Sequence, residues 1–202
     1  MYQYRWQVTQ AIVAAKFVAI VRCATHERAR EVVGALIEGG ATAVEVTMST
    51  PGALAVLEEY RGRALLGVGT VLDESEAAAA AAAGARFIVT PNLDERVIAA
   101  AHRHGLSTLI GCATASEIVR ALSAGADLIK LFPAGGLGTD FIAAIHGPLP
   151  WAPLVPTGGV SVANARQWLA AGAVALGMGG SLCEGTPAEI AARVRELRAV
   201  VA

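Results

Sequence analysis

The sequence predicts an α/β protein folded as a (β/α)8 TIM barrel with a short N-terminal helix. Three observations support this class: short apolar segments alternate with helical ones along the chain, eight such segments occur, and they recur roughly every 20 to 25 residues, as βα units do. Near-continuous apolar strands are typical of parallel sheets covered by helices. The alternative is an open doubly wound sheet, but no G-x-G-x-x-G motif follows the first expected strand.

The first expected element is a leading helix that ends near Lys16. Because Lys16 interrupts the apolar part and no small-residue cleavage pattern follows, this segment does not resemble a signal peptide. Eight strands are then expected at FVAIVR (17–22), AVEVTM (43–48), ALLGVG (64–69), RFIVT (86–90), STLIG (107–111), DLIKLF (127–132), APLVPT (152–157) and AVALGM (173–178).

Helix start and stop signals separate the strands. Thr114 with Glu117 fits a capping box. In this motif the Thr114 side chain accepts a hydrogen bond from the Glu117 N–H, and the Glu117 side chain accepts one from the Thr114 N–H. The alanine run at 77–83 lies between Asp73, a good helix start, and Gly84, a good helix end. It is therefore expected to be a helix, since alanine is the strongest helix former.

Composition limits the possible functions. A chain of 202 residues that is 54% apolar can bury one large core, so residues 1–202 are expected to form a single domain. The net charge of −1 and the even scatter of charges argue against a nucleic-acid partner. The longest uncharged stretch, 141–165, contains four prolines, which exclude a membrane-spanning helix there.

The cysteines and histidines give no sign of a metal site. Three scattered cysteines (Cys23, Cys112 and Cys183) favour a reducing cytoplasm over a disulfide framework or a zinc site. The four histidines lack partners at ligand spacing. We therefore expect a cytoplasmic protein without a metal or other cofactor.

Lys130 is the residue that most strongly suggests chemistry. Lysine occurs only at positions 16 and 130, whereas fourteen arginines supply the other cations. Lysine, unlike arginine, can lose its proton and act as an amine nucleophile. Alternation places Lys130 on the face of Leu128 and Phe132, opposite Ile129 and Leu131, and leaves open which face is interior. Burial would lower its pKa and favour a Schiff base with a carbonyl substrate.

Glu45 is a second charged group within an apolar strand, between Val44 and Val46. An imine mechanism needs a group that carries protons to and from the carbinolamine and the enamine, and a carboxyl can do so. Glu45 could instead be only the ion-pair partner of Lys130 or Arg22. The same alternative, a structural ion pair, remains open for Lys130.

In a (β/α)8 barrel the functional residues are expected at the C-terminal ends of the strands. Polar and glycine residues gather there in this sequence: Arg22, Glu45, Thr47, Thr70, Pro91, Cys112, Lys130, Thr157-Gly158-Gly159 and Gly179-Gly180-Ser181. The glycine turns that follow strands seven and eight would let backbone N–H groups approach an anion, and barrels often bind phosphate at this place.

The sequence resembles the 2-keto-3-deoxy-6-phosphogluconate (KDPG) aldolase family, class I aldolases that include the 2-keto-3-deoxy-6-phosphogalactonate (KDPGal) and 4-hydroxy-2-oxoglutarate aldolases. The matching runs are VAIVR, VEVTMSTP, GVGTVLD, FIVTPN, IKLFPA, VPTGGV and GGSL, in this order along nearly the whole chain. The resemblance implies Lys130 as the Schiff-base residue and Glu45 as general acid/base. It implies Arg22 and Thr70 near the pyruvoyl end, and Gly158, Gly159, Gly180 and Ser181 near the phosphate. Ser49, Pro91 and Thr157 are also expected to be substrate-binding residues.

The chain departs from the family pattern at Ser49, where many relatives have an arginine that binds the substrate carboxylate. Arg22 is then the best remaining candidate for that carboxylate. The expected partners are a phosphorylated 2-keto acid and pyruvate, with neither nucleic acid nor membrane, and the resemblance implies a homotrimer. The expected reaction is cleavage of KDPG to pyruvate and D-glyceraldehyde 3-phosphate. A KDPGal or 4-hydroxy-2-oxoglutarate aldolase, a non-covalent phospho-sugar isomerase or epimerase, and a silent phosphometabolite-binding barrel remain alternatives.

Overall fold

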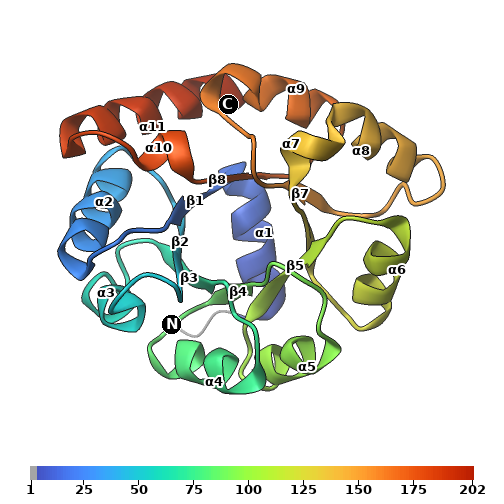
Figure 1. Ribbon diagram of the computed structural model, residues 1–202, viewed down its shortest axis with the longest axis horizontal. Coiled ribbons are helices and arrows are strands. Elements are labelled where there is room, and N and C mark those ends of the chain that lie inside the picture. Colours follow the sequence, from blue (N-terminus) through green and yellow to red (C-terminus); the bar gives the residue numbers. More distant parts are fainter. Residues whose placement is uncertain (1–3) are drawn as a thin grey trace.

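The computed structural model describes residues 4–202, and its eight parallel strands form a nearly closed barrel surrounded by helices (Figure 1). The strand order is β7-β6-β5-β4-β3-β2-β1-β8, and each neighbouring pair is parallel. A bridge between Thr157 and Gly177, together with a hydrogen bond of 3.0 Å from Val174 N to Leu154 O, joins the two ends of this sheet. The predicted (β/α)8 fold class is confirmed.

The strands are β1 Phe17–Val21, β2 Ala43–Thr47, β3 Leu65–Gly69, β4 Phe87–Val89, β5 Ser107–Cys112, β6 Leu128–Leu131, β7 Leu154–Pro156 and β8 Leu176–Met178. The helices are α1 Arg5–Ala15, α2 His26–Glu38, α3 Ala53–Glu59, α4 Glu74–Ala82, α5 Glu95–Arg103, α6 Ala115–Ser123, α7 Ala134–Leu137, α8 Thr139–His146, α9 Ala165–Ala170, α10 Gly180–Cys183 and α11 Pro187–Val201, with a 3-10 helix η1 at Val162–Asn164. All eight predicted strands occur, although each of them except β5 is shorter than expected, β7 and β8 most of all.

The predicted helix caps at Thr114 and Asp73 are present, but the capping box at Thr114 is incomplete, because the Glu117 side chain bonds to Ala113 N and not to Thr114 N. The Thr114 side chain accepts a hydrogen bond from Glu117 N at 3.3 Å, and Glu117 Oε2 accepts one from Ala113 N at 2.9 Å. Asp73 Oδ1 accepts one from Glu76 N at 2.8 Å at the start of α4, which contains most of the alanine run. These bonds satisfy N–H groups that have no partner within the helix.

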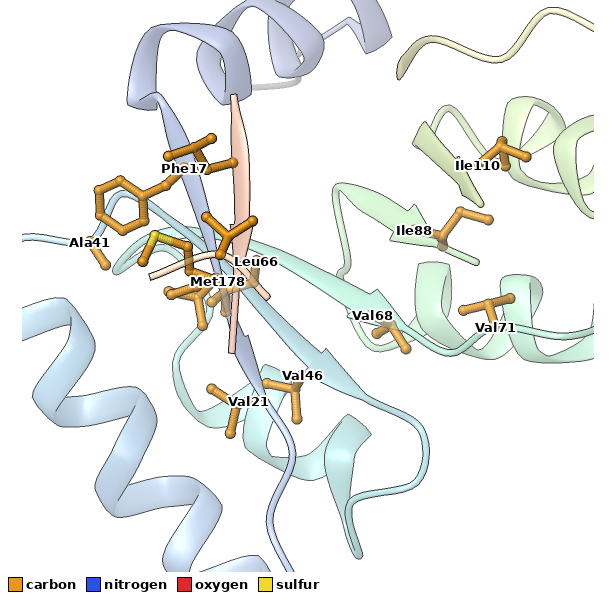
Figure 2. Close-up of a cluster of buried hydrophobic side chains, with 14 of the residues drawn as sticks. Phe17, Val21, Ala41, Val46, Leu66, Val68, Val71, Ile88, Ile110 and Met178 are labelled. Atoms are coloured by element: carbon orange, nitrogen blue, oxygen red, sulfur yellow. The ribbon is translucent and has the colours of Figure 1, made fainter. Parts of the chain in front are cut away.

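Two apolar layers stabilise the barrel. The outer layer lies between strands and helices, and Figure 2 shows part of it, where Val21, Val46 and Val68 come from the neighbouring strands β1, β2 and β3. The inner layer fills the barrel with side chains such as Phe87 and Leu128. Successive residues of a strand point to opposite faces, so each strand contributes to both layers.

Helix α1 closes the N-terminal end of the barrel. Its Val8 and Ile12 are fully buried within the inner layer, and Figure 1 shows the helix across the centre of the ring of strands. Thr9 Oγ1 lies 2.8 Å from Ser107 Oγ at the start of β5. Arg5 Nε lies 3.3 Å from Asp127 Oδ1, just before β6. A ligand can therefore enter only from the opposite end, where the strands finish.

No helix among residues 4–202 combines the length and apolar character that crossing a membrane would need.

Candidate active site

Lys130 lies in the barrel interior. On β6 it shares the inward face with Leu128, which belongs to the inner apolar layer, whereas Ile129 and Leu131 pack against the helices. This answers the question that alternation alone left open. The side chain is 6% exposed, and its Nζ lies 4.9 Å from the centroid of the Phe132 ring at the end of the strand.

Glu45 points into the same interior from β2 and is 2% exposed. Its carboxylate occupies space that a glycine leaves open on β3: a Cβ built at Gly69 would lie 1.7 Å from Glu45 Oε1. Gly67 similarly makes room for the Phe87 ring, 2.3 Å from where its Cβ would be. The two glycines of β3 thus give bulky neighbours access to the barrel interior.

Burial shifts the pKa values of Lys130 and Glu45 in the directions that favour their neutral forms. The pKa of Lys130 is lowered, chiefly because burial penalises its charged form, and Arg22 lowers it further while Glu45 opposes the shift. The pKa of Glu45 is raised by burial, against the attraction of Lys130 and Arg22. A lowered pKa increases the fraction of Lys130 that is free amine, and a raised pKa increases the fraction of Glu45 that carries a proton.

Arg22 follows β1 and reaches across the mouth of the barrel to Thr70, which follows β3. Its Nη2 donates to Thr70 Oγ1 at 3.4 Å. Within residues 4–202 no carboxylate lies within salt-bridge distance of Arg22. Its charge is therefore available to an anionic ligand.

Thr70 has a positive φ of 58°. A β-branched residue is uncommon in the left-handed region, and strained residues of this kind cluster at functional sites. In this conformation the Thr70 hydroxyl lies beside the Arg22 guanidinium.

Ser49 lies in a small group of hydroxyls beyond the end of β2. Its Oγ lies 3.0 Å from Thr47 Oγ1, and Thr47 Oγ1 lies 3.2 Å from Thr50 Oγ1. Thr50 Oγ1 in turn accepts from Cys23 N at 3.2 Å. These hydroxyls connect the end of β2 to the residues that follow β1, near Arg22.

A cavity of about 960 Å³ opens at the C-terminal ends of β1, β6, β7 and β8. Seven of the predicted site residues line it: Arg22, Lys130, Thr157, Gly158, Gly159, Gly180 and Ser181. Glu45, Ser49, Thr70 and Pro91 do not line this cavity. Pro91 is half-buried after β4, and its backbone lies so close to Gly111 of β5 that a Cβ there would be 2.2 Å from the Pro91 carbonyl carbon.

The two glycine turns at one side of the cavity present unbonded N–H groups. Gly158 and Gly159 both have φ of 84°, a conformation that suits glycine. No described group accepts a hydrogen bond from the Gly159 N–H. Gly180 and Ser181 begin helix α10, so their N–H groups have no acceptor within that helix. Such N–H groups are ready donors to an anion.

The lining also includes residues that were not predicted, among them Phe132, Arg28, Cys23 and Cys183. Alternation could have identified Phe132, which shares the face of Lys130. Cys23 and Cys183 come from distant parts of the sequence and meet only through the pairing of β1 with β8. Burial raises the pKa of Cys23 and brings that of Cys183 to about 12, so both thiols stay protonated at neutral pH.

Among residues 4–202 no group of three or more histidine, cysteine or acidic side chains is placed to hold a metal ion. The chemistry that these residues can perform is that of a buried amine, a buried carboxyl and an anion-binding turn.

Comparison with known proteins agrees with this geometry. Residues 8–196 match the family model for KDPG and KHG aldolases. The 2-dehydro-3-deoxy-6-phosphogalactonate aldolase of Escherichia coli is 37% identical over 195 residues, which are 91% of this chain and 95% of that protein. A solved native KDPGal structure is 34% identical with a TM-score of 0.85, covering 91% of this chain and 93% of the other.

A more distant structure is that of the KDPG aldolase of Legionella pneumophila with pyruvate captured as a covalent carbinolamine. It is 26% identical with a TM-score of 0.79, and 96% of each chain is covered. Given the family match over most of its length, the chain belongs to the KDPG and KHG aldolase family.

Proposed function

We propose that this protein is a class I aldolase that cleaves KDPG to pyruvate and D-glyceraldehyde 3-phosphate through a Schiff base on Lys130. The observation that carries the proposal is the placement of Lys130: a buried amine with a lowered pKa, inside a barrel that is closed at one end and opens at the other into an anion-binding cavity. The covalent pyruvate adduct of the Legionella aldolase supports the same chemistry.

The reaction begins when the neutral Lys130 amine attacks the C2 carbonyl of the substrate. The carbinolamine loses water to give an iminium, which accepts the electron pair of the C3–C4 bond as that bond breaks. A proton leaves the C4 hydroxyl as the aldehyde forms. The resulting enamine takes a proton at C3, and hydrolysis then releases pyruvate and the free lysine.

Glu45 is proposed to carry these protons, directly or through one water. Its raised pKa allows it to hold a proton in one step and to accept one in the next. The charge of Lys130 changes during the cycle, and a nearby carboxyl can compensate for that change within the buried site.

The substrate is proposed to lie across the cavity between two anion-binding ends. At one end Arg22 and Thr70 hold the carboxylate next to the C2 carbonyl. Arg22 takes this role because position 49 is a serine and supplies no guanidinium. At the other end the N–H groups of Gly158, Gly159, Gly180 and Ser181 hold the phosphate. Thr157 and Phe132 would shape the wall between them.

KDPGal is the second candidate substrate, favoured by the 37% identity to the Escherichia coli galactonate enzyme over nearly the whole of both chains. The two substrates differ only in configuration at C4. Steady-state kinetics with both, and with 4-hydroxy-2-oxoglutarate, will rank them by kcat/KM.

Covalent trapping tests the function directly. Incubation with pyruvate and sodium borohydride should reduce the imine and attach the three-carbon adduct to Lys130, as peptide mass spectrometry will show. An isomerase, an epimerase or a silent binding protein would remain unlabelled. Lys130→Arg keeps the positive charge but cannot form an imine, so it should lose both the label and turnover. Labelling that persists in this variant would contradict the proposed mechanism.

A homotrimer, a cytoplasmic location and folding of residues 1–202 as one cooperative unit remain proposals that follow from the sequence and the family. Light scattering of the purified protein tests the trimer. A single calorimetric transition tests cooperative folding.

A further inference from the structure

The turn after β7 is held in shape by a side chain that does not line the cavity. Asn164, at the end of η1, donates from Nδ2 to Gly159 O at 2.9 Å. Its Oδ1 accepts from Ser161 N at 2.8 Å. One amide group thus connects the glycine turn with the start of the following helix.

The three carbonyls of this turn are all occupied. Ala134 N donates to Thr157 O at 2.8 Å, and Gly135 N donates to Gly158 O at 2.7 Å. Backbone groups therefore hold the first two carbonyls. The third, Gly159 O, is held by the Asn164 side chain.

A fixed carbonyl also fixes the next N–H. In a trans peptide the C=O and the following N–H point in opposite directions, and the only cis bond among the described residues is Phe132–Pro133. Holding the carbonyls of Thr157, Gly158 and Gly159 therefore directs the N–H groups of the three residues that follow. Those residues, Gly158, Gly159 and Val160, line the cavity, and no described group accepts a hydrogen bond from the N–H of Gly159 or Val160.

We infer that Asn164 is a positioning residue that orients the Gly159–Val160 peptide so that the Val160 N–H becomes a further donor to the substrate phosphate. This inference rests on the proposed function, which places the phosphate at this turn. Glycine at 159 leaves the peptide free to rotate unless something holds it. Asn164 supplies that restraint. Of the three hydrogen bonds that hold the carbonyls of this turn, it makes the only one that a side-chain substitution can remove.

The test pairs Asn164→Asp with Gln167→Glu. Asn164→Asp keeps the oxygen that accepts from Ser161 N but replaces the donor to Gly159 O with an acceptor. Gln167 lies three residues further on, in α9, and is exposed, so Gln167→Glu makes the same amide-to-carboxylate change without touching the turn. The control therefore accounts for the added charge.

For Asn164→Asp we expect KM for the phosphorylated substrate to rise about tenfold, the equivalent of about 1.4 kcal/mol. The Kd for inorganic phosphate, measured by calorimetry, should rise by a similar factor. Turnover of 4-hydroxy-2-oxoglutarate and pyruvate trapping at Lys130 should stay within about twofold of wild type, because neither needs the phosphate end. Gln167→Glu should match wild type in all four measurements.

Three results would overturn the inference: an unchanged KM and phosphate Kd, equal increases in both variants, or an equal loss on phosphorylated and unphosphorylated substrates. Failure of the proposed function is distinguishable, because the wild type itself would then trap no pyruvate.

Discussion

Gly69→Ala tests the geometry that brings Glu45 into the barrel. Gly69 pairs with Thr47 across β2 and β3, and a Cβ at this position would lie 1.7 Å from Glu45 Oε1, 2.4 Å from Cδ and 2.8 Å from Cγ. Ordinary contact begins near 3.4 Å, so the carboxylate must move by about 1.7 Å. Because the hydrogen bonds of the sheet hold the backbones of β2 and β3 in place, the Glu45 side chain has to move.

This displacement should lower kcat more than stability. A misplacement of about 1 Å can cost on the order of 10² in rate, so we expect kcat for KDPG to fall about 10²-fold. Overpacking costs about 1–3 kcal/mol in a well-packed interior, so the melting temperature should fall by several degrees. Pyruvate should still label Lys130, since the amine is untouched.

Steady-state kinetics, borohydride trapping and a thermal melt measure these effects. The matched control is Gly147→Ala at the end of α8, where the nearest atom to an added Cβ is 3.5 Å away and φ is −54°. It should leave kcat unchanged. A folded Gly69→Ala enzyme whose kcat is within twofold of wild type would refute the argument that the position of Glu45 limits the reaction.

Three other substitutions test the remaining parts of the site. Glu45→Gln keeps the shape and removes the proton carrier, so kcat should fall by about 10² to 10⁴ while slow trapping at Lys130 survives; unchanged turnover would leave Glu45 as a structural group. Arg22→Ala should weaken pyruvate trapping by about 1.5–3 kcal/mol, the value of a charged hydrogen bond, and Ser49→Arg should partly restore it. Trapping like that of wild type would assign the carboxylate to other groups. Gly159→Asp should raise KM sharply for the phosphorylated substrate and little for 4-hydroxy-2-oxoglutarate, and equal effects would argue against phosphate binding there.

The sequence alone was sufficient for the fold class and for most of the chemistry. Eight apolar segments and their helix caps are local features, set by the period of the chain and by hydrogen bonds a few residues apart. Lys130 stood out because lysine occurs at only two positions and arginine supplies the other cations of the chain. The strand ends predicted where polar residues would gather, because the carboxyl ends of parallel strands lie at one edge of the barrel.

Only the tertiary structure decided which face of β6 is interior. Leu128 and Phe132 are as apolar as Ile129 and Leu131, and a strand buried on both faces carries no sign of which side faces the barrel axis. Closure of the sheet places Lys130 inside and raises the pKa of Glu45 while lowering that of the lysine. The pKa shifts arise from burial, which no local pattern specifies.

The structure also revealed contacts between residues far apart in the chain. The empty space at Gly69 that admits Glu45, the bond between Arg22 and Thr70, and the support that Asn164 gives to Gly159 all depend on how strands and turns are arranged around the barrel. Sequence determines which groups are available. Their distances and burial are set by packing, because each depends on atoms contributed by other strands and helices.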